Sequence, residues 1–142
     1  MNNQSLFQKK YAEDRKFGTS EEDKQLDKLK TAFGDDLEKI QSRWSRMDYK
    51  SSNCYVEMKS RRCNHNTYET TMVGEGKLKY AEKREVPTYF AFNFQDGIYY
   101  WKYNKEDIEN GKVTFSEGGR YDRGRIEKDM YAYIEKDLLK PI

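Results

Sequence analysis

Two acidic residues and a lysine lie close together near the middle of the chain, in an order that could support metal-dependent chemistry. Glu57 and Lys59 share one short segment, and Asp48 lies nine residues before Glu57. In an extended strand, Glu57 and Lys59 point to the same side, about two residue rises (~7 Å) apart. Carboxylates bind Mg²⁺, and such ions can stabilise a phosphodiester's charge, activate water and assist the leaving oxygen. These residues therefore predict metal-dependent cleavage of phosphodiesters.

Each of these residues has an expected role and a simpler explanation. Asp48 and Glu57 are the expected metal ligands, and the carbonyl of Met58 could supply a third oxygen. Lys59 could hold the attacking water or steady the developing charge on the phosphate. Glu-x-Lys on a strand is, however, usually a solvated face, and Asp48 could simply begin a turn. The spacing alone leaves both explanations open.

A helix before these residues adds another acid. Leu26, Leu29 and Phe33 mark a buried helical stripe that ends at Gly34. Projecting this stripe towards the N-terminus reaches Glu22 rather than Glu21, which aligns with the solvent side. Glu22 could therefore contribute a metal ligand through water from the helix end. It also fits a T-x-x-E capping box that needs no function.

The strands that position the acids follow directly. Residues 35–43 fit a strand or a short helix. Trp44–Lys50 is the predicted short strand that carries Asp48, and Ser51–Asn53 is a turn. Cys54–Arg61 is the predicted central strand, with an apolar face towards the core. A hairpin of these two strands would place Asp48 near Glu57.

The remaining chain predicts further helices and strands. In chain order we expect a helix over Thr70–Lys83, a hairpin of Thr88–Phe94 and Ile98–Tyr103 around Gln95–Gly97, one helical turn in Asn104–Gly111, a basic loop starting at Gly118–Gly119, and a last strand at Asp129–Glu135. Alternation of helices and strands predicts an α/β fold with a mixed sheet.

Composition favours one folded domain that has no strong overall charge. The chain has 142 residues, of which 37% are charged, 35% hydrophobic and 15% aromatic, with a net charge of +2. Abundant Tyr and Trp supply buried area, so a folded domain with a charged surface is expected. We expect a helical extension at residues 1–17 and one domain at 18–142. Without a long apolar run or a secretory signal, the expected location is intracellular, cytoplasmic or nuclear.

Other chemical groups are weaker candidates. Cys54, Cys63 and His65 invite a zinc site, but C-x₈-C-x-H matches no usual ligand spacing and lacks a fourth ligand. A Cys–His nucleophile pair is no better supported, because nothing in the sequence orients His65. Only two cysteines indicate a reducing compartment. Aromatic residues of the hairpin could stack nucleic-acid bases, although aromatic strands are more often core: Tyr89, Tyr99, Tyr100, Trp101 and Tyr103.

The ordered set Glu22, Asp48 and Glu57-Met58-Lys59 resembles the signature of the PD-(D/E)XK nuclease superfamily, which has the restriction-endonuclease-like fold. The segment from Asp48 to Lys77 is similar to small nuclease-like proteins of phages and large DNA viruses. This similarity extends through Phe92–Gly97 and Gly119–Gly124, so that it covers roughly residues 18–135. Met47 stands where the nominal motif has proline, a position that varies widely in such proteins.

The resemblance implies a fold and an activity. The implied fold is a restriction-endonuclease-like αβββαβ core with a central mixed sheet flanked by helices. The implied activity is hydrolysis of DNA with Mg²⁺, for which Mn²⁺ substitutes. Asp48 and Glu57 carry over as metal ligands, Lys59 as the catalytic lysine and Glu22 as the helix acid. Basic residues expected to contact duplex or branched DNA are Arg61, Lys77, Arg120, Arg123 and Arg125.

Two other functions stay open from the sequence. One is a non-catalytic nucleic-acid-binding or scaffold module that retains the nuclease fold. The other is an interaction subunit whose partner covers the aromatic hairpin. The near-neutral charge keeps the interaction subunit open, and a homodimer is compatible with the nuclease interpretation because many nucleases of this fold cut both strands as dimers.

Overall fold

The computed structural model describes residues 25–42, 44–120 and 127–142. The strands are β1 (Glu38–Lys39), β2 (Tyr49–Lys50), β3 (Tyr55–Ser60), β4 (Thr70–Gly74), β5 (Thr88–Phe94), β6 (Gly97–Lys102), β7 (Val113–Arg120), β8 (Glu127–Glu135) and β9 (Lys140–Pro141). The helical segments are residues 25–33, α2 (Glu75–Glu82), α3 (Lys105–Glu109) and a short 3₁₀ turn (Lys136–Leu138). The predicted extension at residues 1–17, Glu22, Arg123 and Arg125 lie outside the described residues.

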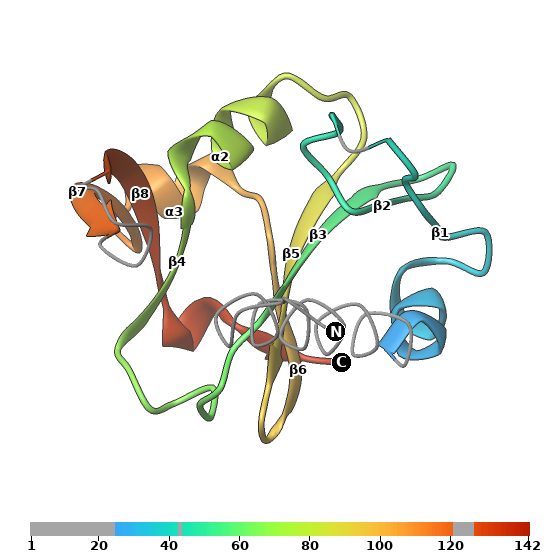
Figure 1. The fold of residues 1–142 in the computed structure, drawn as a ribbon, viewed down its shortest axis with the longest axis horizontal. Coiled ribbons are helices and arrows are strands. Elements are labelled where there is room, and N and C mark those ends of the chain that lie inside the picture. Colours follow the sequence, from blue (N-terminus) through green and yellow to red (C-terminus); the bar gives the residue numbers. More distant parts are fainter. Residues whose placement is uncertain (1–24, 43, 121–126) are drawn as a thin grey trace, which may run out of the picture.

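The strands form two sheets (Figure 1). The larger sheet has six strands in the order β1-β2-β3-β5-β6-β9, and the smaller has the order β4-β8-β7. Strands β3 and β5 are parallel, whereas β1-β2, β2-β3, β5-β6 and β6-β9 are antiparallel. The prediction of a mixed α/β fold around a central mixed sheet is therefore confirmed.

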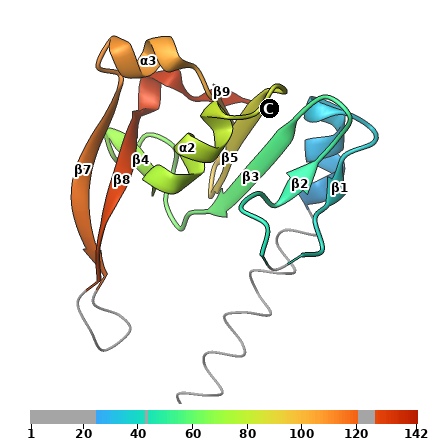
Figure 2. The same ribbon diagram turned by 90° about the horizontal axis from the view of Figure 1, so that it is seen from above.

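Side-chain alternation on the central strands creates one core on each face of the large sheet. On β5, Phe90 and Phe92 pack with Leu78 of α2 and with residues of the smaller sheet. Ala91 lies on the opposite face, in a cluster that includes Leu29 of the first helix. Figure 2 shows α2 lying between the two sheets and the first helix beside β1. The two helices thus cover opposite faces of the sheet.

Several predicted elements are confirmed. The first helix stops at Gly34, whose φ of 136° few other residues adopt. The central strand appears as β3. The β5–β6 hairpin turns at Gly97, which also has a positive φ of 137°. The helical turn expected in Asn104–Gly111 is α3, and the Asn104 side chain caps it by accepting from the Glu106 N–H.

Two predicted boundaries around the acids change. The segment left open at residues 35–43 contributes the short strand β1. The strand predicted at Trp44–Lys50 is wrong in its first part, because only β2 is extended. Before β2 the Ser45 hydroxyl donates to the Met47 carbonyl at 2.9 Å and accepts from the Met47 N–H at 3.2 Å. These local side-chain bonds form a turn in place of a strand ladder.

The smaller sheet is the main feature that differs from prediction. A helix over Thr70–Lys83 is wrong in its first half, because residues 70–74 form β4 and pair with β8. The β-branched residues there favour a strand, and the helix begins only after Gly74.

The start predicted for the basic loop, Gly118–Gly119, is likewise wrong, since both glycines lie in β7, and residues 121–126 lie outside the described residues. A Cβ on Gly118 would lie 2.7 Å from the Tyr131 ring of the neighbouring strand β8. The glycine is therefore required by the close approach of that ring rather than by a turn. Asp129–Glu135 belongs to β8, but it is not the last strand, because β9 follows.

Candidate active site

Asp48 immediately precedes β2, and the β2–β3 hairpin brings it beside β3. Its carboxylate Oδ2 accepts from the Met58 N–H at 2.9 Å, and its own N–H donates to the Val56 carbonyl at 3.1 Å. The Ile40 N–H donates to the Asp48 carbonyl at 2.8 Å. Two bonds therefore fix the backbone and the side chain of this acid against β3, and the third connects its carbonyl to the residue that follows β1.

Glu57 lies on the β3 face that α2 covers. Its relative exposure is only 1%, because its register partner on β5 is the buried Phe90 and α2 closes the space above it. Apolar residues on either side of it in sequence, Val56 and Met58, face the opposite core. Burial of the carboxylate argues against the simpler explanation that Glu-x-Lys is a solvated strand face.

Two lysines lie beside the buried carboxylate and partly offset the cost of burying its charge. Lys59 Nζ lies 3.2 Å from Glu57 Oε1, and Lys77 Nζ lies 3.5 Å from Glu57 Oε2. Lys59 extends from the same strand with a side chain that is 42% exposed, so its ammonium reaches the surface. Lys77 comes from α2 and also donates to the Arg46 carbonyl in the turn before Asp48. One carboxylate thus connects β3, α2 and the turn.

The orientation of Lys77 follows from how α2 packs on β3. Tyr55, two residues before Glu57, meets Tyr80 edge-on with ring centroids 6.3 Å apart. Lys77 and Tyr80 are three residues apart and share one helix face. The sequence predicts Lys77 as a contact to DNA phosphate and misses its contact with Glu57. Lys77 and Tyr80 are three residues apart on one helix face, and Tyr55 and Glu57 are two residues apart on one strand face. This matched spacing is the signal that could have revealed the contact between Lys77 and Glu57.

The electrostatic environment of Glu57 is strongly perturbed. Burial raises the pKa of Glu57, and the neighbouring Asp48 carboxylate raises it further. Lys59 and Lys77 act in the opposite direction by favouring the charged form. A buried carboxyl with a perturbed pKa beside a second acid and two amines is typical of functional sites.

The residues present suit a hard divalent cation. Asp48 and Glu57 supply carboxylate oxygens, the donors that Mg²⁺ prefers. The N–H and C=O groups of one strand residue point towards the same neighbouring strand. Because the Met58 N–H points to Asp48, the Met58 carbonyl faces the Asp48 side as well. Within residues 25–42, 44–120 and 127–142, no group of three or more His, Cys, Asp or Glu side chains could hold a metal. The candidate metal ligands among the described residues are therefore the Asp48 and Glu57 carboxylates and the Met58 carbonyl.

Of the other predicted residues, Arg61 is held by the protein itself. Its Nη2 donates to the Met72 carbonyl of β4 at 2.8 Å, and its guanidinium lies 5.9 Å from the centre of the Phe92 ring. Burial lowers the pKa of Arg61. Arg61 thus links the end of β3 to the smaller sheet. Arg120 ends β7, and its role in DNA contact stays a prediction.

The cysteines and the histidine lie in other environments. Cys54 is buried in the core and Cys63 is half-buried, and both are free thiols. His65 Nδ1 lies 2.5 Å from Asp96 Oδ2, and its ring stacks on Tyr99 with centroids 4.1 Å apart. These contacts connect His65 to the β5–β6 hairpin rather than to a cysteine.

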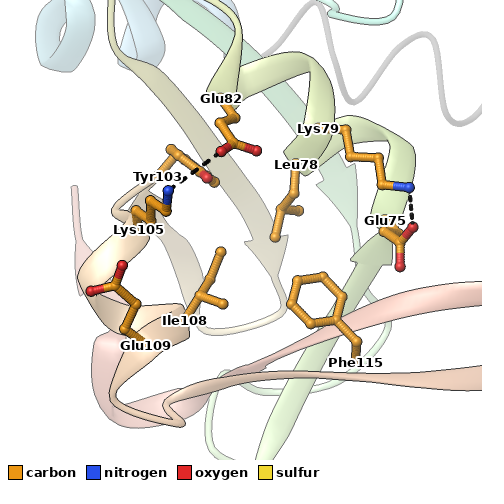
Figure 3. A pocket seen from close by; sticks show the side chains of 9 residues that line it. All are labelled: Glu75, Leu78, Lys79, Glu82, Tyr103, Lys105, Ile108, Glu109 and Phe115. Carbon is orange, nitrogen blue, oxygen red and sulfur yellow. Dashed lines mark ion pairs between the residues drawn. The ribbon is translucent and has the colours of Figure 1, made fainter.

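A pocket of about 260 Å³ lies on a different face of α2 (Figure 3). Leu78, Ile108 and Phe115 contribute apolar surface to it. Ion pairs at its rim join Lys79 to Glu75 at 2.7 Å and Lys105 to Glu82 at 3.8 Å. With Glu109 also at its edge, the rim carries more acids than bases. It is separate from the Glu57 cluster and poorly suited to nucleic-acid phosphates.

Fold and site together define a class of protein. A mixed sheet that carries Asp, Glu-x-Lys and a covering helix is the arrangement expected of PD-(D/E)XK nucleases. The chain belongs to the family described as "phage putative PDDEXK endonuclease", whose model matches residues 9–140. The match supports both the nuclease class and the phage origin of the family. No curated protein and no solved structure matches the chain.

The described part of the chain contains no helix that is long and apolar enough to cross a membrane.

Proposed function

We propose that this protein is a Mg²⁺-dependent endodeoxyribonuclease that acts through Asp48, Glu57 and Lys59. The observation that carries the proposal is the buried Glu57 carboxylate, with Asp48 beside it and one lysine at each of its oxygens. A buried acid near a second acid destabilises the fold unless cations compensate, so such a cluster is retained for chemistry more readily than for stability.

The order of elements supports the αβββαβ core of the nuclease fold. The helix at residues 25–33 precedes the antiparallel strands β1, β2 and β3, and α2 precedes β5. Strand β5 runs parallel to β3. In this assignment β4 is an insertion between β3 and α2 that joins the smaller sheet. Residues 18–142 would then form one domain.

Asp48, Glu57 and the Met58 carbonyl would hold Mg²⁺, and Mn²⁺ would substitute for it. When bound, the ion supplies positive charge that stabilises the scissile phosphate. Lys59 lies at the surface next to Glu57, where it can donate hydrogen bonds to the attacking water or to the phosphate oxygens. Lys77 holds Glu57 from the helix side and thereby orients the carboxylate.

The remaining assignments complete the proposal. Glu22 contributes through water from the first helix. DNA phosphate contacts come from Arg61, Arg120, Arg123 and Arg125, to which Lys77 adds positive charge. Cleavage of both strands of a duplex would require a homodimer.

The test measures cleavage of plasmid and branched DNA by the full chain. EDTA should abolish cleavage, and added Mg²⁺ should restore it. Lys59→Ala should lower the rate by about 10²–10³-fold while circular dichroism shows that the chain stays folded. A moderate fall in melting temperature is expected, because Lys59 Nζ lies 3.2 Å from the buried Glu57 carboxylate. Lys79→Ala, whose ion pair is exposed on another face of α2, is the matched control and should cleave normally.

Two outcomes would count against this function. Cleavage that survives the combined Asp48→Ala and Glu57→Ala substitutions would refute the site. Equally tight DNA binding with and without Mg²⁺, with no cleavage of any substrate, would instead support the non-catalytic module.

A further inference from the structure

Strand β7 forms one edge of the smaller sheet. Of the described strands only β8 pairs with β7, so no described strand covers the other edge of β7. Residues 114–117 are all exposed, and they include the large apolar side chain of Phe115, which is 37% exposed. Figure 2 shows β7 at the outer margin of the molecule. An open strand edge of this kind can pair with an extended segment of another protein.

The direction of the backbone groups identifies which residues face this open edge. The Glu135 N–H donates to the Lys112 carbonyl at 3.1 Å, so the backbone groups of Lys112 point towards β8. This direction alternates from residue to residue along an antiparallel strand. The N–H and C=O groups of Phe115 and Glu117 therefore point away from β8. Phe115 thus presents a main-chain donor and a main-chain acceptor at the open edge.

The Phe115 side chain also lines the pocket of about 260 Å³ beside α2 (Figure 3). Leu78 of α2 and Ile108 of α3 contribute the other aliphatic surface of this pocket. Pockets that enclose a drug-sized ligand usually have volumes of roughly 300–1,000 Å³, so this one suits a single side chain better. A segment paired with β7 would lie about 4.8 Å from it, close enough for a side chain facing α2 to enter the pocket.

The charges at the rim of the pocket favour a basic partner. Lys79 and Lys105 each pair with one glutamate of α2. Glu109 also lines the rim, and no lysine or arginine among the described residues forms an ion pair with it. Glu109 ends α3, whose last turn has no basic residue, so its charge opposes the helix dipole. A lysine or arginine of a partner would compensate this charge.

We infer that the open edge of β7 and the adjoining pocket bind an extended segment of a partner protein. The segment pairs with the backbone of Phe115, inserts one aliphatic side chain beside Leu78, and places Lys or Arg against Glu109. A second copy of this chain would bring the same surplus of acids to the edge, which disfavours pairing of β7 with itself. The surface is separate from the Asp48–Glu57 site, so this inference does not depend on the proposed function.

Selection from a library of short random peptides on the full chain provides the first test. Enriched peptides should combine an aliphatic residue with a nearby Lys or Arg. The affinity of a labelled, enriched peptide is then measured by fluorescence polarisation. Methylating the backbone nitrogen of each peptide residue in turn should weaken binding at every second position, because alternate N–H groups of an extended segment pair with β7.

Variants of the chain separate the pocket from the rest of the surface. Phe115→Ala should weaken binding of the enriched peptide roughly 5- to 30-fold, because it removes apolar surface that the peptide covers. Glu109→Lys should weaken binding roughly 3- to 10-fold. Met72→Ala on β4, an exposed apolar residue, and Glu38→Lys on β1, an exposed acid, are the matched controls and should bind normally. Circular dichroism checks that each variant is folded.

Several outcomes would overturn this inference. Failure to enrich any peptide, or enrichment of acidic peptides, would refute it. So would equal losses in Phe115→Ala and Met72→Ala, or losses on backbone methylation that do not alternate. A dimer that Phe115→Ala dissociates would identify a second copy as the occupant and would also refute it. Lys59→Ala should leave peptide binding unchanged, so the nuclease proposal and this inference can fail separately.

Discussion

Lys77→Met is the substitution that examines the Glu57 cluster most directly. Lys77 Nζ lies 3.5 Å from Glu57 Oε2, and the Lys77 side chain is 30% exposed. Two unit charges at this separation attract by about 5 kcal/mol at an effective dielectric constant of 20. Desolvation offsets much of this attraction, and Lys59 remains beside Glu57. A hydrogen bond to a charged group contributes about 1.5–3 kcal/mol net, and the long distance favours the lower end.

We therefore expect Lys77→Met to lower the free energy of unfolding by about 1.5 kcal/mol without metal. For a domain of this size, that corresponds to a fall in melting temperature of about 5 °C. Mg²⁺ should reduce the difference in stability between wild type and Lys77→Met, because a bound cation replaces the lost charge. A ligand present at ten times its Kd stabilises a fold by about 1.4 kcal/mol. Differential scanning calorimetry with EDTA and with saturating Mg²⁺ measures both effects.

Lys79→Met on the same helix is the control. Its ammonium lies only 2.7 Å from Glu75, but the lysine side chain is 68% exposed. Solvent screening should limit its loss to about 0.5 kcal/mol or less, with no dependence on Mg²⁺. The reasoning is refuted if both variants lose equal stability, or if Mg²⁺ leaves the Lys77→Met gap unchanged.

Three further predictions concern other parts of the fold. The pKa of Glu57 is raised in the folded state. Proton binding to this carboxyl therefore contributes fully to the free energy of unfolding below the ordinary pKa, and this contribution is lost as the pH rises through the raised pKa. Without metal, Glu57→Gln should therefore gain stability relative to wild type as the pH rises above the ordinary Glu pKa of 4.5, and a pH-independent difference in melting temperature would contradict this. Gly118→Val should cost about 1–3 kcal/mol, because its Cβ would overlap the Tyr131 ring, and urea unfolding should show a lower midpoint at an unchanged slope. The buried Trp101 indole N–H donates to the Asp107 carboxylate at 2.8 Å, and Asp107→Ala removes this acceptor. The free energy of unfolding should fall by about 1–3 kcal/mol, and an unchanged melting temperature would argue against this reasoning.

The sequence is informative where a local pattern decides the structure. Alternation along β3 predicts that Val56 and Met58 face one core and that Glu57 faces the other side. The short connection between the strands predicts that Asp48 approaches Glu57. Both depend on the period of a strand and on one hairpin, which operate within about fifteen residues.

Features that depend on distant segments could not be predicted in this way. The burial of Glu57 requires α2 to cover β3, and the inward orientation of Lys77 depends on where that helix begins. Val73 belongs to a strand because β8, about sixty residues away, pairs with it. A glycine such as Gly118 usually indicates a loop, but at this position glycine is needed because the Tyr131 ring leaves no room for a Cβ atom. Tertiary contact overrides local preference at each of these positions.

The parallel pairing of β3 with β5 also constrains the order in which the molecule can fold. Asp48 and Glu57 come together through a local hairpin, which closes a small loop. The β3–β5 ladder joins residues 33 positions apart, from Tyr55↔Thr88 to Ser60↔Asn93, and β4 pairs with residues near the C-terminus. Contacts between distant segments cost more loop entropy and form more slowly. We therefore expect Asp48, Glu57 and Lys59 to come together in the early hairpin before Lys77 reaches Glu57, so that Lys59 alone offsets the two carboxylates until the helix and β5 are in place.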